Sequence, residues 1–198
     1  MQRELEARHK KPRQKLAIPA VIPAWTLFLV AITRGSGSIA DDSREDYQNP
    51  DYGYAIRIPP GVGLEKSKPP NPNHGFGIRL GPESLLWVDA SYTDDVSLHT
   101  VVTSERQSWE GNCRELTHRP AQLGGLAAER MTLKCASAQD RGVPAIVTLV
   151  VAVSSRPNRG TVKYEIGSRL PFGQPTTADA LKVFRKLVEG FHLIPVRR

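Results

Sequence analysis

The stretch AIVTLVVAVS, residues 145–154, is the most apolar β-type run in the body of the chain. It is dominated by valine and other aliphatic residues, which is typical of a strand in the centre of a sheet. A turn signal, Pro157-Asn158-Arg159-Gly160, follows it, and residues 161–170 then alternate between apolar and polar side chains. These patterns predict a central strand followed by a second strand.

Residues 176–190 predict the last helix of the chain. Thr176 or Thr177 can cap its N-terminus, and Gly190 ends it. The apolar side chains recur at helical spacing, as expected for a helix with one buried face. They are Ala180, Leu181, Phe184, Leu187 and Val188. Residues 191–195 leave the helix, and we expect them to pack back on the core.

Cys113 and Cys135 are the only cysteines, and the turn signal Gly124-Gly125 lies midway between them. A hairpin that turns there places the two cysteines opposite each other, within reach of a disulfide. The two strands would span residues 113–123 and 126–135. In this register Leu116 points to the polar face, so either a bulge shifts the register or the first strand is a poorly buried edge. No CxxC motif is present, so we expect a structural disulfide rather than free thiols or a redox-active pair.

The region before this hairpin predicts three short strands and a helix. The strands span residues 54–58, 76–80 and 85–92, and the helix spans 95–109 with Asp94 or Asp95 as its cap. The predicted order is therefore β-β-β-α-β-β-β-β-α. Because most strands are linked as hairpins, the predicted fold class is α+β, an antiparallel β-sheet with two flanking helices.

The N-terminal segment has the pattern of a secretory signal. Cationic residues come first, residues 16–32 carry no charge, and a polar stretch follows, with Ser38 and Ala40 as the small residues before a cleavage point. We expect residues 1–40 to be a signal peptide or an N-terminal membrane anchor; the alternative of a buried helix is disfavoured by two prolines in the apolar run. The acidic and polar residues 41–53 predict a flexible linker, and residues 54–195 a single α+β domain.

The basic character of the chain belongs mostly to this leader. The net charge of the whole chain is +7, of which residues 1–40 contribute +5 and the remainder +2. We therefore expect no nucleic acid as partner. The expected location is periplasmic or secreted, or alternatively anchored in the inner membrane and facing outward. An uncleaved leader would make the membrane a partner, and no cysteine follows the apolar run to support a lipoprotein anchor.

Three stretches together with the element order carry a resemblance to a known fold. They are Tyr54–Pro59, a strand that ends in proline; Leu123–Arg130, a turn that leads into a strand; and Phe184–Leu193, a helix with a final segment. The chain resembles the Mog1/PsbP-like fold, an α/β/α sandwich, including the small bacterial exported proteins of that group. This group includes photosystem-associated subunits, a nuclear-transport cofactor and bacterial lipoproteins and chaperones. The resemblance therefore implies a fold and no single activity.

No motif of catalysis, of cofactor binding or of metal binding stands out, and no cofactor is expected. The five histidines, His9, His74, His99, His118 and His192, are far apart and show no ligand spacing. His74 is a weak candidate for a binding loop, because it lies in a loop of proline, asparagine and glycine between two predicted strands. The alternative is a solvated loop without a function.

The favoured hypothesis is a non-enzymatic exported envelope protein that binds a partner protein or a small ligand. One alternative is a chaperone or immunity-type assembly factor, which an exposed apolar groove would favour. Another is an enzyme without a recognisable motif, which titratable side chains converging in one cleft would favour.

Overall fold

The computed structural model describes residues 46–66, 74–136, 143–156, 160–174 and 177–195. The leader and its expected cleavage point lie outside these residues. The helices are α1 (Leu98–Trp109) and α2 (Thr177–Gly190). The strands are β1 (Asp46–Asn49), β2 (Tyr54–Arg57), β3 (Glu65–Lys66), β4 (Gly75–Arg79), β5 (Leu85–Thr93), β6 (Cys113–Leu123), β7 (Leu126–Cys135), β8 (Ala145–Arg156), β9 (Gly160–Pro171) and β10 (Phe191–Leu193).

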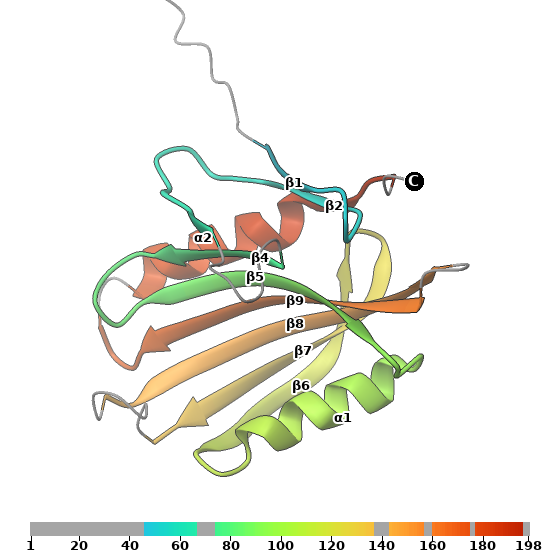
Figure 1. Cartoon of the computed structure of the whole chain (residues 1–198). Coiled ribbons are helices and arrows are strands. Elements are labelled where there is room, and N and C mark those ends of the chain that lie inside the picture. The colour runs from blue at the N-terminus through green and yellow to red at the C-terminus, as the bar shows by residue number, and fades with distance from the viewer. Residues whose placement is uncertain (1–45, 67–73, 137–142, 157–159, 175–176, 196–198) are drawn as a thin grey trace, which may run out of the picture. The chain divides into compact units, whose positions relative to one another are not determined.

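Seven strands form one large antiparallel sheet in the order β3-β4-β5-β9-β8-β7-β6. Strand β8 lies between β9 and β7, which confirms the prediction of a central strand, and its side chains are buried on both faces of the sheet. Val147, Leu149 and Val151 pack on the side of α1, whereas Val150 and Ala152 pack on the side of α2. Figure 1 shows the two helices on opposite faces of this sheet.

The layer on the α2 side contains a second, three-stranded sheet in the order β1-β2-β10. The predicted strand over 54–58 therefore belongs to this small sheet rather than to the large one. Phe191 pairs with Ile56, is 3% exposed, and stacks on Tyr54 at 5.4 Å between ring centroids. The prediction that residues 191–195 pack back on the core is therefore confirmed for Phe191, whereas His192 and Leu193 are exposed. Phe184 and Leu187 of α2 complete that core.

Strand β1 shortens the linker that the sequence predicts over residues 41–53, so the folded part begins before Tyr54. Tyr47 packs its ring against Phe76 at 4.7 Å between centroids, and Asn49 is 2% exposed. The polar composition of this segment hides the strand, because its order comes from pairing with β2 and from the contacts of the Tyr47 ring with Tyr54 and Phe76. Strand β3 was missed for a similar reason, since its two residues are both exposed.

Helix α1 begins at Leu98, with Ser97 at the N-cap position, so the prediction that Asp94 or Asp95 caps it is wrong. The backbone N–H of Asp95 donates to Thr93 Oγ1 at 3.1 Å, which holds the residues after β5 in a turn and delays the start of the helix. Val101 and Val102 are buried against β7 and β8, as the spacing predicts.

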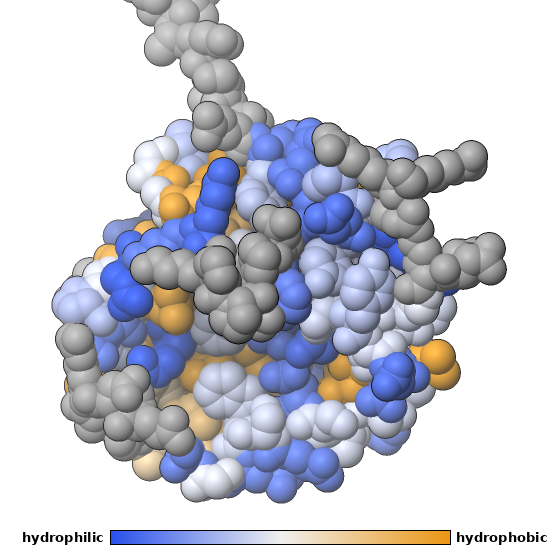
Figure 2. All heavy atoms as spheres, in the orientation of Figure 1, coloured by the Kyte–Doolittle hydropathy of each residue, from blue (hydrophilic) through white to orange (hydrophobic). Residues whose placement is uncertain are grey.

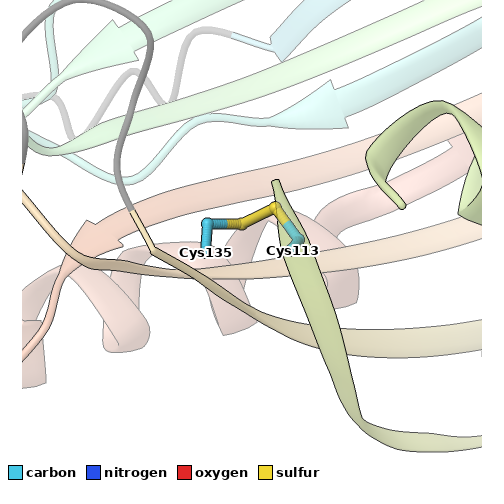
Figure 3. The surroundings of a disulfide bond; sticks show 2 residues. All are labelled: Cys113 and Cys135. Atoms are coloured by element: carbon cyan, nitrogen blue, oxygen red, sulfur yellow. A yellow bond between two sulfur atoms is a disulfide. The ribbon is translucent and has the colours of Figure 1, made fainter. Parts of the chain in front are cut away.

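The disulfide between Cys113 and Cys135 is present and joins the first residue of β6 to the last residue of β7 (Figure 3). The sequence predicted either a bulge or a poorly buried edge strand at Leu116, and the structure shows both. A bulge shifts the register between Glu115 and Thr117, and β6 is an edge strand of the sheet, with Leu116 44% exposed.

The described chain is thus an antiparallel sheet with a helix on each face, which confirms the α+β fold class. Within the described ranges no helix is long and apolar enough to span a membrane. In the view of Figure 2, hydrophobic residues reach the surface in small areas separated by hydrophilic ones.

Reduction of the disulfide should lower the melting temperature without unfolding the protein. The closed loop restricts the unfolded chain and contributes roughly 3 kcal/mol in the chain-entropy model, while the core beneath it stays intact. Calorimetry with and without reductant, with circular dichroism as the control for folding, measures this. An unchanged melting temperature would contradict a structural role for the bond.

Candidate functional site

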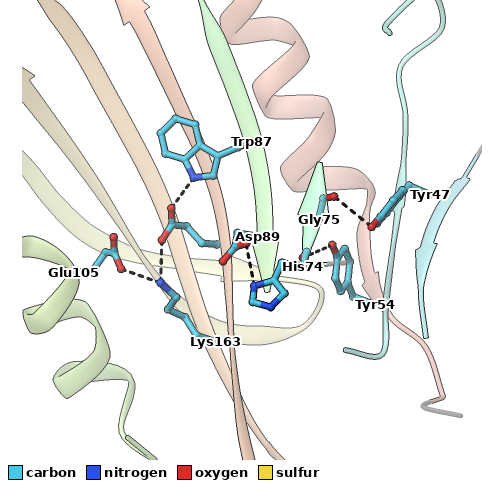
Figure 4. Close-up of polar contacts among 9 residues, drawn as sticks. Tyr47, Tyr54, His74, Gly75, Trp87, Asp89, Glu105 and Lys163 are labelled. Atoms are coloured by element: carbon cyan, nitrogen blue, oxygen red, sulfur yellow. Dashed lines mark hydrogen bonds and ion pairs between the residues drawn. The ribbon is translucent and has the colours of Figure 1, made fainter. Parts of the chain in front are cut away.

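The register of β5 and β9 assembles a row of polar side chains on the α1 face of the large sheet. Asp89 lies opposite Glu165, and Trp87 lies opposite Gly167. Lys163 is two residues from Glu165 on the same face, because side chains alternate along a strand. Helix α1, which packs on this face, adds Glu105, and Figure 4 shows it close to Lys163, with Trp87 and Asp89 nearby.

Trp87 lies flat on β9 because position 167 has no side chain. A Cβ atom at Gly167 would lie 2.0 Å from Cε2 of the indole, far inside van der Waals contact. In this position the indole N–H donates to Glu165 Oε1 at 2.6 Å. Gly167 therefore fixes the ring that holds one oxygen of a buried carboxylate.

Lys163 joins two carboxylates. Its ammonium donates to Glu105 Oε2 at 2.9 Å and lies 3.4 Å from Glu165 Oε2. The side chains of these residues are 20%, 18% and 8% exposed for Lys163, Glu105 and Glu165, so solvent screens the charges only in part. The network links α1 to β9 and, through Trp87, to β5.

The pKa values of Glu165 and Lys163 are both raised, although for different reasons. Burial, reinforced by the nearby charge of Glu105, raises the pKa of Glu165 above its ordinary value, against the opposing effect of Lys163 and of the indole hydrogen bond. Burial lowers the pKa of Lys163, but the charges of Glu165 and Glu105 outweigh it, and the net direction is upward. The lysine is therefore held as a cation between two carboxylates.

His74 lies at the edge of this network. Its Nδ1 is 3.8 Å from Asp89 Oδ1, and burial raises the pKa of Asp89 despite the charges of His74 and Lys163. The carbonyl of His74 accepts hydrogen bonds from Tyr54 Oη at 3.1 Å and from the backbone N–H of Ala90 at 2.9 Å. The candidate residue is thus anchored to the fold.

A cluster of aromatic rings extends from His74 towards the surface, and we name Tyr52, His74 and Tyr92 the tyrosine rim. The Tyr52 ring lies 5.2 Å from the rings of both His74 and Tyr92, measured between centroids. Tyr92 is 53% exposed. The carbonyl of Tyr52 accepts from Tyr164 Oη at 2.8 Å and from Arg156 at 2.7 Å, which holds the rim in place.

A cavity of about 240 Å³ opens between the end of β5 and the first turns of α1. Hydroxyl groups of Ser91, Thr93 and Ser104 line it together with Glu105 and Lys163. Tyr92 also contributes, so the cavity adjoins the rim. This region combines aromatic rings, hydroxyl groups and an excess of carboxylates over free cations.

The other described histidines do not join this region, and His9 lies outside the described residues. His118 pairs with Glu129 on β6 and β7, His192 contacts the carbonyl of Gly190, and His99 is exposed on α1. Across the described ranges, no group of three His, Cys, Asp or Glu side chains is arranged to hold a metal ion.

The sequence did not reveal the role of Lys163 and Glu165. Their alternation with Val162 and Tyr164 predicts a polar face, but the structure covers that face with α1. The available signal was Glu105, a charged residue on the apolar side of a predicted helix. A buried cation on the facing strand is the arrangement that would satisfy it.

No model of a known protein family matches the chain, and no curated protein matches it by sequence. Among solved structures, it is similar to the Ran-binding protein Mog1p of Saccharomyces cerevisiae, with a TM-score of 0.51 and 12% identity over 76% of this chain and 95% of that chain. The chain has the Mog1/PsbP-like fold. This confirms the resemblance drawn from the element order.

Two further solved structures are similar to the chain with lower TM-scores. Cyanobacterial PsbP from Synechocystis sp. PCC 6803 has a TM-score of 0.48 and 16% identity over 80% of this chain and 97% of that chain. A protein of unknown function from Pseudomonas aeruginosa, described as a putative regulator, has a TM-score of 0.42 and 13% identity over 78% and 98%. The similarity to solved structures concerns the fold alone.

Replacement of Gly167 by alanine should destabilise the protein by about 1–3 kcal/mol, because the new methyl group displaces the Trp87 indole. Urea denaturation of Gly167→Ala measures the change. Gly81→Ala is the matched control, since a Cβ atom at Gly81 meets open space. Equal stability of the two variants would contradict the close packing of Trp87 on β9.

The stability of the protein should fall as the pH rises from about 4.5 through the raised pKa of Glu165. In that window the folded state retains a proton that the unfolded state has lost, so the unfolded state binds fewer protons and the slope is negative. Glu165→Gln should make this fall shallower, whereas the exposed Glu115→Gln should not. Denaturation curves between pH 4 and pH 8 measure the slopes, and identical slopes for wild type and Glu165→Gln would contradict the assignment.

Proposed function

We propose that this chain is an exported, non-catalytic binding protein of the cell envelope, and that the tyrosine rim docks a partner protein. The observation that carries the proposal is the rim itself, in which the exposed Tyr92 contacts the ring of the buried Tyr52, and that ring also contacts His74. Tyrosine provides large contact area with few rotatable bonds, which is why it is enriched at protein interfaces.

The chemistry of the rim favours a partner that presents a lysine or arginine side chain. Asp51 and Asp89 are close enough to raise the pKa of Tyr52, after the larger effect of burial. Aromatic faces and carboxylates both attract cations. Two cations of the described residues that lie near the rim are already engaged, Arg156 with the carbonyls of Tyr52 and Gly53, and Lys163 with its two carboxylates.

The non-catalytic part of the proposal is supported by how the polar groups are engaged. Glu105, Lys163 and Glu165 satisfy one another, and the remaining oxygen of Glu165 accepts from the indole of Trp87. A general base or a nucleophile needs an unengaged atom within reach of a substrate. The arrangement instead suits the joining of a helix to a sheet.

Export is supported by two independent features. The disulfide between the only two cysteines persists in oxidising compartments, which include the bacterial periplasm. The leader has the charge and hydropathy order of a secretory signal, so we assign residues 1–40 to a signal peptide or an anchor. What remains of the linker would join it to the folded domain.

A protein partner is compatible with this fold in another chain. Mog1p, which shares the fold, is a Ran-binding protein. At 12% identity its partner is not carried over. Titratable side chains do converge at the cavity lined by Glu105 and Lys163, but these two side chains pair with each other, which favours a binding protein over an enzyme.

Site-specific photocrosslinking in the native host tests the proposal. A benzophenone amino acid replaces Tyr92 in one variant and Phe172 in another, because both are exposed aromatic residues, at 53% and 60%, and Phe172 lies outside the rim. After irradiation of whole cells, we expect one defined protein adduct from position 92 and none from position 172. Adducts of equal pattern from both positions, or none from position 92, would contradict the docking surface.

The same cells test the compartment. Fractionation should recover the chain with the envelope or the medium, and thiol labelling without reductant should find neither cysteine reactive. A cytosolic chain with two reactive thiols would refute export and leave the docking result to be judged by itself.

A further inference from the structure

Three arginines from three different elements line one cavity on the α2 side of the large sheet. Arg119 comes from β6, Arg130 from β7 and Arg185 from α2, and the cavity has a volume of about 320 Å³. Val150, which pairs with Arg130 across β7 and β8, belongs to the core under α2 and so fixes the face of the sheet. This cavity lies on the opposite face of the sheet from the Lys163 network.

The arrangement brings like charges together. Arg119 lies directly opposite Arg130 in the register of β6 and β7, and cross-strand like charges destabilise a sheet. Arg185 adds a third cation from the helix. Burial lowers the pKa of Arg130, and the charges of Arg119 and Arg185 lower it further, in line with the closeness of both cations to Arg130.

Among the residues that the structure describes, these guanidinium groups have no carboxylate partner within ion-pair distance. Among the described residues, none of the three arginines forms an ion pair, whereas Arg57, Arg79 and Lys182 each lie within 4.0 Å of a carboxylate oxygen. Arg185 donates through Nε to the carbonyl of Leu181 at 3.3 Å, and Arg130 lies over the Phe184 ring at 5.7 Å from its centroid.

Glu189 is the one acidic side chain among the described residues that line the cavity, so these residues carry two net positive charges at neutral pH. The remaining lining is apolar, from Pro120, Phe184 and Val188 among others. Most of the N–H donors of the three arginines are therefore free for a ligand, next to a surface that would exclude water from it.

We propose that this cavity binds a phosphate monoester whose organic group packs on Phe184 and the neighbouring apolar side chains. A phosphate monoester carries close to two negative charges at neutral pH, which matches the net charge of the lining, and its oxygens accept the paired N–H groups that arginine presents. The bound phosphate would offset the repulsion between Arg119 and Arg130. The proposal is independent of the tyrosine rim, which lies elsewhere on the fold.

Calorimetric titration with phenyl phosphate tests this chemistry on the protein recovered from the envelope in its oxidised form. Arg130→Gln should weaken binding by about tenfold or more, as expected for the loss of a charged hydrogen-bond donor. Lys134→Gln is the matched control, because it removes the same charge from the same face of β7, four residues away and outside the lining of the cavity. That variant should change the affinity by less than about threefold, since Lys134 contributes only screened, long-range attraction.

The melting temperatures of the ligand-free variants distinguish a loss of binding from a failure to fold. Arg130→Gln removes a like-charge contact, so its melting temperature should equal or exceed that of the wild type. Arg185→Gln, on the exposed side of α2, gives a second variant that should weaken binding in the same way. The proposal is overturned if neither millimolar phenyl phosphate nor phosphatidic acid vesicles bind. It is also overturned if Arg130→Gln and Lys134→Gln weaken binding equally.

Vesicles distinguish the source of the phosphate group. Phosphatidic acid carries a phosphate monoester, whereas phosphatidylglycerol carries a diester of lower charge. Binding of phenyl phosphate identifies a small soluble ester, and binding only to phosphatidic acid vesicles identifies a lipid headgroup; both support the monoester site. Equal binding of both vesicle types, unaffected by Arg130→Gln, would show a general attraction to anionic surfaces and would contradict it.

Discussion

Strand β8 has buried side chains on both of its faces, and this requires a second layer on each side of the large sheet. Its aliphatic side chains alternate between a core shared with α1 and a core shared with α2 and the small sheet. The apolar side chains on each face of β8 must be covered by a layer of other elements. A strand with one polar face would need a covering layer on its apolar face alone. The three-layer arrangement follows from this one strand, and the remaining strands extend it outwards.

The Lys163 network and the arginine cavity both lie beside a helix that packs on the large sheet. Helix α1 packs on β7 and β8, and its Glu105 reaches Lys163 on β9. Helix α2 packs on β9 and β2, so its outer side meets the arginines of β6 and β7 along the cavity. The two faces therefore differ in electrostatics: on the α1 side one lysine pairs with two carboxylates, and on the α2 side none of the three arginines forms an ion pair with a described residue. A closed network stabilises a fold, whereas uncompensated like charges are a cost that a ligand can offset.

The sequence predicted those elements whose pattern is local. The apolar run over 145–154, the hairpin around Gly124-Gly125 and the last helix were all recoverable, because each depends on spacing along one segment. Strands β1 and β3 were missed, since their order comes from pairing with partners rather than from their own side chains. The start of α1 was misplaced because Thr93 holds Asp95 in a turn.

The candidate site was harder to predict, because it depends on register. His74 was recognised from its loop, but its contact with Asp89 and its place in the tyrosine rim need the alignment of β4 with β5. Arg119 lies opposite Arg130 in the register that starts at the Gly124-Gly125 turn, where Leu123 pairs with Leu126. The bulge at Leu116 shifts the register beyond Thr117 and so brings Cys113 opposite Cys135. A register counted back from the cysteines without this bulge would place Glu129 opposite Arg119.

Residue-resolved native-state hydrogen exchange tests the dependence of both layers on β8 most directly. The account predicts that amides of β8 and β9 exchange only through global unfolding, with the same free energy as denaturation, and that the inner amides of α1 and α2 share this unit. The result that would contradict it is separate opening of β8, with either helix layer still protected after β8 has exchanged.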